Sequence, residues 1–407
     1  MAGADTVVSG GGFGDIAAPA NPDDNPMRLF SFLSLSLCLA ASAQAADIAA
    51  LVPGPHAVGS TNLQVTPPAG KPLIDHLNGS KDGSYLSAIL THPRAVPQLQ
   101  VTVPASDPYA GALAGKPQPL VLHILYPTPA ANPRPDYAFP YKETGDAVVP
   151  HMQGPADKPL LADPAAKYPL IVYSGGYNTH GLWHLGHLKG LASHGYIVVN
   201  LFHGDSRAPG YHESVALRQA GVRAALDFVL KDPVFGPAID PERIGASGAS
   251  AGGMTVLALL GGTDPKHPGR SARDARIKAG FGLVPFMGGS FGIWPFQTDA
   301  WHVGRDFAGL GAVKAPFFAV YADQDKSVSA DAVRAGVRRL GGPTWAVELP
   351  GEGHLLSPAA EREAYSWELT FFDAVLRGNA DAWAKLVTGT KVREVGKGQM
   401  TFTSAGR

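Results

Sequence analysis

Residues 248–252 read GASAG and match the G-x-S-x-G pattern of a nucleophilic serine, with Ser250 at the centre. The sequence predicts an apolar strand over residues 243–246 and a helix-compatible apolar run over 254–260. The pattern needs this strand–turn–helix context, because small neighbours let the backbone turn sharply and expose the serine hydroxyl. Ser247 is the competing nucleophile, but its flanking residues fit the pattern less well. An ordinary glycine-rich turn is the alternative interpretation.

A nucleophilic serine needs a histidine base and an acid that orients the histidine. When the serine lies on such a strand-to-helix turn, the chain order is serine, then Asp or Glu, then histidine. Asp325 follows a predicted strand over 317–321, and His354 follows a predicted strand over 345–349. Both residues therefore belong to the carboxyl edge of a parallel sheet, where the serine also emerges. Asp323 is the rival for the role of the acid.

The reaction also needs hydrogen-bond donors for the oxyanion that develops on the substrate. One donor is the backbone N–H of the residue after the nucleophile, here Ala251. The second comes from the loop after an earlier strand, and residues 174–177, which read SGGY, follow a predicted strand over 170–173. Glycines there allow the backbone amides to turn toward the substrate. We predict Tyr177 as the second donor, and a plain Gly-Gly turn is the alternative.

The elements that must position these residues are continuous apolar runs separated by segments of helical length. Such runs are too apolar for burial on one side only, so they predict a mainly parallel central sheet with helices on both faces. The predicted strands are 120–126, 170–173, 196–201, 243–246, 317–321 and 345–349, and the predicted helices are 182–193, 215–230 and 330–340.

Composition excludes several classes of function. The chain has 407 residues, a formal net charge of -1 and only 16% charged residues. This balance gives no electrostatic reason to expect nucleic acid or an anionic membrane surface as a partner. Cys38 is the only cysteine, and it lies in an apolar stretch near the start of the chain. A chain cleaved after that stretch has no thiol for a disulfide, a nucleophile or a metal site.

The N-terminal region predicts export. Residues 27–45 combine a short positive start, an apolar run and the small-residue pattern of residues 43–45, as in a secretory signal peptide. The apolar run is too short for a stable membrane span, which needs about 20 residues. Residues 1–26 form a leader that resembles no targeting element. We therefore expect a periplasmic or secreted protein; a buried N-terminal helix is the alternative.

Short motifs along the chain carry a family resemblance: 124–127 (ILYP), 167–173 (KYPLIVY), 175–177 (GGY), 193–199 (SHGYIVV), 248–253 (GASAGG) and 322–325 (ADQD). Together they resemble the α/β-hydrolase superfamily. Within it they are similar to the bacterial dienelactone-hydrolase-like group, which includes relatives of the platelet-activating-factor acetylhydrolases and the polyester hydrolases.

The resemblance covers roughly residues 120–375 and implies the α/β-hydrolase fold. It also implies a Ser250, Asp325 and His354 triad, with the Tyr177 and Ala251 amides as the oxyanion donors. Ala249 departs from the pattern, because many relatives have His or a bulky aromatic residue there. The shape of the substrate cleft is therefore less predictable than the triad.

The expected organisation divides the chain beyond residue 45 into three parts. Residues 46–115 form an N-terminal extension with short strands, 116–377 the catalytic domain, and 378–407 a C-terminal helix and tail.

Two further patterns suggest binding sites. His180, His184 and His187 have the spacing of one helix face, and three imidazoles are enough to hold zinc. No His-Glu-x-x-His element accompanies them, so we favour polar packing residues and expect no metal. A glycine-rich stretch over 286–301 is rich in aromatic residues and is either core or the wall of a substrate pocket. Trp294 is the predicted substrate-binding residue.

The predicted function is an exported serine hydrolase that cleaves carboxylic esters, either small molecules or polymers, through an acyl-enzyme intermediate. No cofactor is expected. Fold and triad do not determine the substrate, so an amidase or acyltransferase with the same triad is an alternative. Another is an exported binding protein that has the fold without catalysis.

Overall fold

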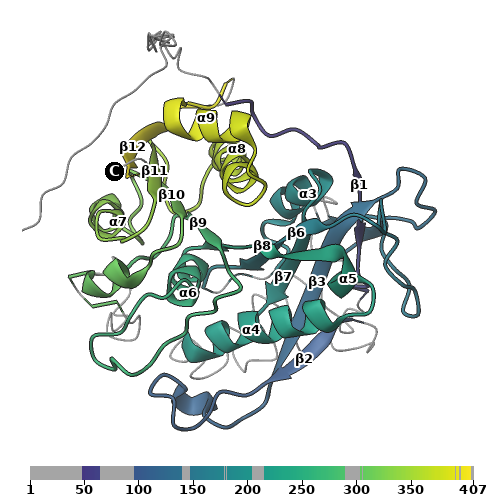
Figure 1. Ribbon diagram of the computed structural model, residues 1–407, viewed down its shortest axis with the longest axis horizontal. Coiled ribbons are helices and arrows are strands. Elements are labelled where there is room, and N and C mark those ends of the chain that lie inside the picture. The colour runs from purple at the N-terminus through teal and green to yellow at the C-terminus, as the bar shows by residue number, and fades with distance from the viewer. Residues whose placement is uncertain are drawn as a thin grey trace, which may run out of the picture. The chain divides into compact units, whose positions relative to one another are not determined.

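Strands form the centre of the fold (Figure 1). The central strands are buried at every position, so their side chains are covered on both faces of the sheet. The computed structural model describes residues 48–64, 96–139, 147–177, 179, 181–203, 215–288, 303–304, 306–389, 391–393 and 396–404. The predicted leader over 1–26 and the predicted signal peptide over 27–45 lie outside these residues.

The central sheet has ten strands in the order β1-β3-β7-β6-β8-β9-β10-β11-β12, with β2 also paired to β3. The strands are β1 (Ala57–Ser60), β2 (Gln98–Val101), β3 (Gln118–Thr128), β6 (Tyr168–Ser174), β7 (Ile197–Phe202), β8 (Ile239–Ala249), β9 (Ala279–Leu283), β10 (Phe317–Ala322), β11 (Thr344–Leu349) and β12 (Gln399–Thr403). Neighbours from β7 to β11 are parallel, whereas β3 and β12 pair antiparallel at the two sides. The prediction of a mainly parallel sheet is confirmed. A separate two-stranded sheet pairs β4 (Tyr137–Ala138) with β5 (Val148–Val149).

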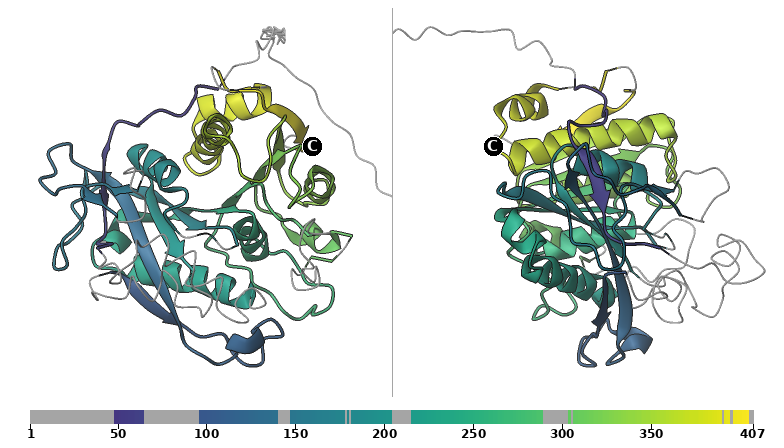
Figure 2. Two further views of the ribbon diagram at one scale, coloured as in Figure 1. Left: turned by 180° about the vertical axis from the view of Figure 1, so that it is seen from behind. Right: turned by 90° about the vertical axis from the view of Figure 1, so that its right-hand side faces the viewer.

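Helices cover both faces of this sheet. They are α3 (Leu185–Ser193), α4 (Val215–Lys231), α5 (Phe235–Ala238), α6 (Ala251–Leu259), α7 (Ala330–Val337), α8 (Pro358–Val375) and α9 (Ala380–Thr388), with short 3₁₀ helices η1 (Gly111–Leu113) and η3 (Ala308–Ala312). One apolar cluster joins the sheet to α4, α6 and α7, and a second joins it to α3, α8 and α9. Figure 1 shows α4 and α6 on one side of the sheet and α3 and α8 on the other, and the right-hand view of Figure 2 shows α8 lying lengthwise over its face.

The strand sequences explain this two-sided burial. Successive side chains of a strand point to opposite faces of the sheet. In β6, Leu170 and Val172 belong to the first cluster, whereas Ile171 and Tyr173 belong to the second. A strand with apolar residues at every position therefore needs helices on both of its faces.

The segments that flank the predicted catalytic domain also contribute to the sheet. Strands β1 and β2 belong to the predicted extension over 46–115, and both pair with β3. The predicted C-terminal segment over 378–407 contains the expected helix, α9, and also β12, which pairs with β11. The sheet therefore extends beyond the predicted domain at both ends of the chain.

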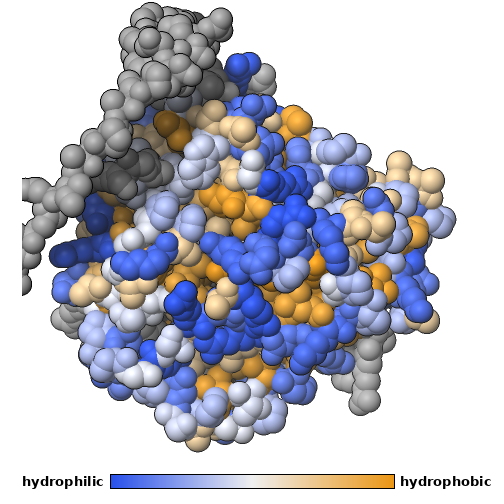
Figure 3. All heavy atoms as spheres, in the orientation of Figure 1, coloured by the Kyte–Doolittle hydropathy of each residue, from blue (hydrophilic) through white to orange (hydrophobic). Residues whose placement is uncertain are grey.

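The surface is mixed in polarity. On the face seen in Figure 3, hydrophobic and hydrophilic side chains are interspersed. Within the part of the chain that the structure describes, no helix is both long and apolar enough to cross a membrane.

One buried histidine makes the stability of the fold depend on pH. His123 in β3 is 0% exposed, and neither ring nitrogen has a hydrogen-bond partner among the described residues. Burial, together with the positive charge of Lys189, lowers the pKa of His123 to about 3. The His123 ring of the native state therefore stays neutral at pH values at which the same ring in the unfolded chain binds a proton.

Acid will destabilise the fold through His123. The unfolded state takes up the proton near pH 6.5 but the native state only near pH 3, so the free energy of unfolding falls as pH drops through this window. The loss between pH 7 and pH 5 is about 2 kcal/mol. Urea unfolding at both pH values will show this loss in the wild type and a smaller one in His123→Leu. An equal loss in both proteins would contradict the role of His123.

Candidate active site

The turn at Ser250 has a strained backbone. Strand β8 ends at Ala249 and helix α6 begins at Ala251, so Ser250 occupies the single residue between them. Its φ of 50° and ψ of -114° lie where residues other than glycine rarely occur. A Cβ atom on Gly252 would collide with the carbonyl oxygen of Ser174, which explains the need for glycine there. The strand–turn–helix prediction is confirmed: the strand is longer than predicted at both ends, and the helix begins three residues earlier and ends one residue earlier than the predicted run.

Three predicted site residues meet at this turn. The Oγ of Ser250 lies 3.1 Å from Nε2 of His354, and Nδ1 of the same ring lies 2.7 Å from Oδ2 of Asp325. Asp325 follows β10, and His354 follows β11, so adjacent parallel strands deliver the acid and the base to one edge of the sheet. The distances are those of a serine–histidine–carboxylate hydrogen-bond chain.

The Asp325 carboxylate is held in place on both oxygens. Its Oδ1 accepts backbone hydrogen bonds from Ser327 (2.7 Å) and Val328 (2.8 Å), which leaves Oδ2 for His354. The side chain is buried, so water does not compete for these contacts. The acid is therefore preorganised to receive the imidazole N–H.

Neither rival residue occupies this arrangement. The Oδ1 of Asp323 accepts a hydrogen bond from the backbone N–H of Gly351 at 2.6 Å, so this carboxylate braces the loop that carries His354. Ser247 is buried within β8 and does not line the cavity at the turn.

The predicted oxyanion donors lie beside Ser250. Gly176, in the loop after β6, is close enough that a Cβ atom on it would lie 3.5 Å from the Ser250 Cβ. Tyr177 follows in this loop and lines the cavity. Ala251 is the first residue of α6, so no carbonyl group of that helix accepts its N–H. Both backbone amides come from segments that lie next to the hydroxyl.

A buried arginine that the sequence analysis did not identify holds the same loop. In α4, Arg218 donates hydrogen bonds to the carbonyl oxygens of Gly175 (2.7 Å) and Gly176 (3.0 Å). His203 lies 2.7 Å from the hydroxyl of Ser174 through Nε2. Burial, then the charge of Arg218, lowers the pKa of His203 well below its ordinary value, so its imidazole is neutral. Arg218 therefore holds two carbonyl groups of the loop, and His203 contacts the serine side chain that precedes them.

Removing the Arg218 guanidinium will impair this loop. Loss of one oxyanion donor lowers kcat by about 10²–10³-fold. Arg218→Met misplaces the donor loop only in part, so we expect kcat for the predicted ester hydrolysis to fall by about 10- to 100-fold, with a smaller effect on KM. Arg218→Lys will recover part of the loss, because one ammonium group can reach one of the carbonyl oxygens.

The matched control is Arg223→Met on the same helix, where the guanidinium bonds the carbonyl oxygens of Ser271 and Arg273 at the surface. Steady-state kinetics and the melting temperature are measured for all three variants. An equal decrease in kcat in the Arg218 and Arg223 variants, or a change in KM alone, would show that Arg218 has no positioning role.

A cavity of about 210 Å³ opens at the candidate site. Its lining includes Ser250 and His354, together with apolar walls from Leu283, Leu355 and Leu356. Exposed hydrophobic side chains mark its rim: Leu355 is 71% exposed and Trp183 is 46% exposed. The hydroxyl and its base therefore face a small, largely apolar space.

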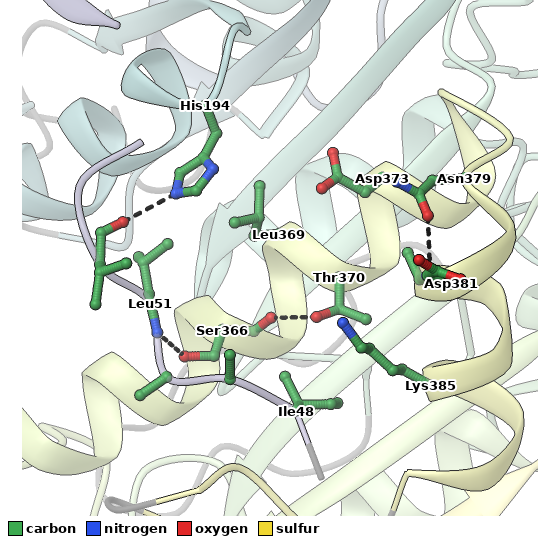
Figure 4. A pocket seen from close by; sticks show the side chains of 14 residues that line it. Ile48, Leu51, His194, Ser366, Leu369, Thr370, Asp373, Asn379, Asp381 and Lys385 are labelled. Atoms are coloured by element: carbon green, nitrogen blue, oxygen red, sulfur yellow. Dashed lines mark hydrogen bonds between the residues drawn. The ribbon is translucent and has the colours of Figure 1, made fainter. Parts of the chain in front are cut away.

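A second cavity, of about 270 Å³, is larger but lacks this chemistry. It lies between residues 48–52 and helices α8 and α9 (Figure 4). Two of its hydroxyl groups bond within the protein: Ser366 accepts from the N–H of Leu51, and the hydroxyl of Thr370 donates to the Ser366 carbonyl oxygen. Because no nucleophile–base pair lines it, we assign the candidate active site to the smaller cavity.

Two of the three histidines with helical spacing contact side chains of α8. The Nδ1 of His184 lies 2.6 Å from the hydroxyl of Tyr365, and the Nε2 of His187 lies 2.8 Å from Oε2 of Glu368. His180 lies outside the described residues. Across the described residues, no group of three or more His, Cys, Asp or Glu side chains is arranged to hold a metal ion.

The aromatic stretch over 286–301 is only partly described. Phe286 and Met287 are buried in the core, so they do not form a pocket wall. Trp294, the predicted substrate-binding residue, lies outside the described residues.

Sequence reasoning overlooked Arg218 and the cavity residues Leu355, Leu356 and Glu361. Arg218 had a signal: it lies one helical turn before Val222, on the buried stripe of α4 that continues with Ala225 and Val229. An arginine on such a stripe requires buried partners. The cavity residues after His354 carry no comparable pattern.

No protein-family model and no curated protein match this chain.

Proposed function

We propose that this protein is a serine hydrolase of the α/β-hydrolase fold that cleaves carboxylic esters through an acyl-enzyme intermediate. The observation that carries the proposal is the chain of contacts from the strained Ser250 through His354 to the buried Asp325, at 3.1 Å and 2.7 Å. The parallel strand order and the helices on both faces are compatible with the proposed fold.

The mechanism follows from these contacts. As Oγ of Ser250 attacks the ester carbonyl carbon, Nε2 of His354 takes its proton, and Asp325 stabilises the imidazolium through Nδ1–H. The tetrahedral oxyanion receives hydrogen bonds from the Tyr177 and Ala251 amides. His354 then protonates the leaving alcohol. Water attacks the acyl-enzyme by the same proton transfers, which releases the acid and restores the serine.

The cavity supports a preference for small ester groups. Its volume of about 210 Å³ is below the roughly 300–1,000 Å³ that is usual for sites of drug-sized ligands. Apolar walls disfavour an acyl chain that carries a carboxylate. Export to the periplasm or medium, which rests on residues 27–45, belongs to the same proposal.

Covalent labelling together with a substrate panel tests this function. We expect a fluorophosphonate to label Ser250 of the purified protein. We also expect the protein to hydrolyse p-nitrophenyl esters, with a preference for short acyl chains. An amidase would cleave the matched p-nitroanilides at comparable rates. A protein that is neither labelled nor active on any ester would be a binding protein, and the proposal would fail.

A further inference from the structure

The cavity beside Ser250 contains one carboxylate. Glu361, in the first turn of α8, lines the cavity, and its side chain is 33% exposed. Within the described residues, it is the only Asp, Glu, Lys or Arg among the lining residues. The segment after His354 runs directly into α8, so the base and this carboxylate approach the cavity from the same part of the chain.

The Glu361 carboxylate forms no hydrogen bond with the neighbouring His184. Nδ1 of His184 lies 3.8 Å from Oε1 of Glu361, which is beyond hydrogen-bond distance. That nitrogen instead lies 2.6 Å from the hydroxyl of Tyr365. No described residue donates a hydrogen bond to the Glu361 carboxylate. Burial raises the pKa of Glu361, and this effect is partly opposed by His187.

Aromatic rings share the cavity with this carboxylate. Tyr177 and Trp183 both line it. A substituted ammonium group is stabilised by aromatic faces and by a nearby negative charge, and it needs no hydrogen bond of its own. An anionic group would instead be repelled by the carboxylate in a partly desolvated site.

We infer that Glu361 is a specificity-determining residue that, with the aromatic walls of the cavity, recognises a substituted ammonium group on the substrate. This inference rests on the proposed ester hydrolysis at Ser250 and specifies its substrate class. The preferred substrates are small esters with a positive charge on either the alcohol or the acyl part. Esters with a carboxylate at the same position are poor substrates.

Isosteric pairs of esters isolate the contribution of charge. Acetylcholine is compared with neohexyl acetate, in which carbon replaces the nitrogen. For the acyl side, the p-nitrophenyl ester of trimethylammoniobutyrate is compared with its tert-butyl analogue. At pH 8, the wild type will show a kcat/KM about 5-fold higher for the cation in at least one pair. The ratio will shrink at high salt.

Glu361→Gln removes the charge and keeps the size. The ratio within the pair will fall to about one, because the isosteres then differ little in binding. Comparing two substrates within one variant cancels any general loss of active enzyme. A role of Glu361 in packing alone would lower kcat/KM for both members equally and leave the ratio unchanged.

The matched control is Glu242→Gln, near the opposite end of β8 from Ser250, where the side chain is 78% exposed. This variant will retain the wild-type ratio. No cation preference in either pair, or an unchanged ratio in Glu361→Gln, overturns the inference while ester hydrolysis stands. Absence of both hydrolysis and fluorophosphonate labelling overturns the proposed function and the inference with it.

Discussion

Ser250→Ala will reduce kcat for ester hydrolysis by about 10⁵-fold or more and abolish labelling by a fluorophosphonate. The reason is that Ser250 Oγ is the only hydroxyl placed at 3.1 Å from His354 Nε2 among the described residues. Without it the cavity retains the oxyanion donors, which leave only slow attack by water. Kinetics with an activated ester and mass spectrometry of the labelled protein measure the two effects.

Ser247→Ala is the matched control, because it removes a hydroxyl three positions earlier on the same strand. Ser247 is buried within β8 and does not line the cavity, so the variant will retain labelling and most of the activity. The proposed nucleophile would be wrong if Ser250→Ala remained labelled, or if labelling depended on Ser247 instead.

Asp325→Asn will reduce kcat by about 10⁴-fold with little loss of fold. The amide retains an oxygen for the Ser327 and Val328 N–H groups, but it no longer stabilises the imidazolium that forms when His354 takes the serine proton. If the amide NH₂ faces Nδ1, it also forces the wrong tautomer of the ring. Steady-state kinetics and a thermal melt separate the catalytic loss from a stability loss.

Asp323→Asn makes the same change two residues away. Its side-chain oxygen still accepts from Gly351, so kcat will fall by less than about 10-fold. Comparable losses in the Asp325 and Asp323 variants would mean that the charge of the loop, rather than the contact with His354, supports the reaction.

Much of the sheet was predictable from short apolar runs. The predicted strand over 317–321 corresponds to β10 (Phe317–Ala322), and that over 345–349 to β11 (Thr344–Leu349). These runs are short and apolar at successive positions, and such a pattern is typical of strands buried on both faces. Strand β9 (Ala279–Leu283) was missed, since its sequence AGFGL contains two glycines, which weaken the strand signal.

The ends of the sheet were less predictable. Strands β1 and β12 lie far apart in the chain from the runs that define the central strands, and β12 alternates between half-buried and exposed residues. Only pairing with a neighbour, antiparallel in both cases, makes such short segments into strands. Pairing partners are a property of the tertiary structure.

The sequence by itself determined the order of the candidate residues: a serine in a glycine-rich turn, then Asp325, then His354, each just after an apolar run. Chain order and local pattern suffice for this, because each residue is positioned by the strand before it. Only the tertiary structure decided between Asp325 and Asp323, since that choice depends on which carboxylate faces the imidazole. It also brought Arg218 to the loop at Gly175 and Glu361 to the cavity. The buried stripe of α4 indicates that Arg218 needs partners, but only tertiary packing determines which groups these are.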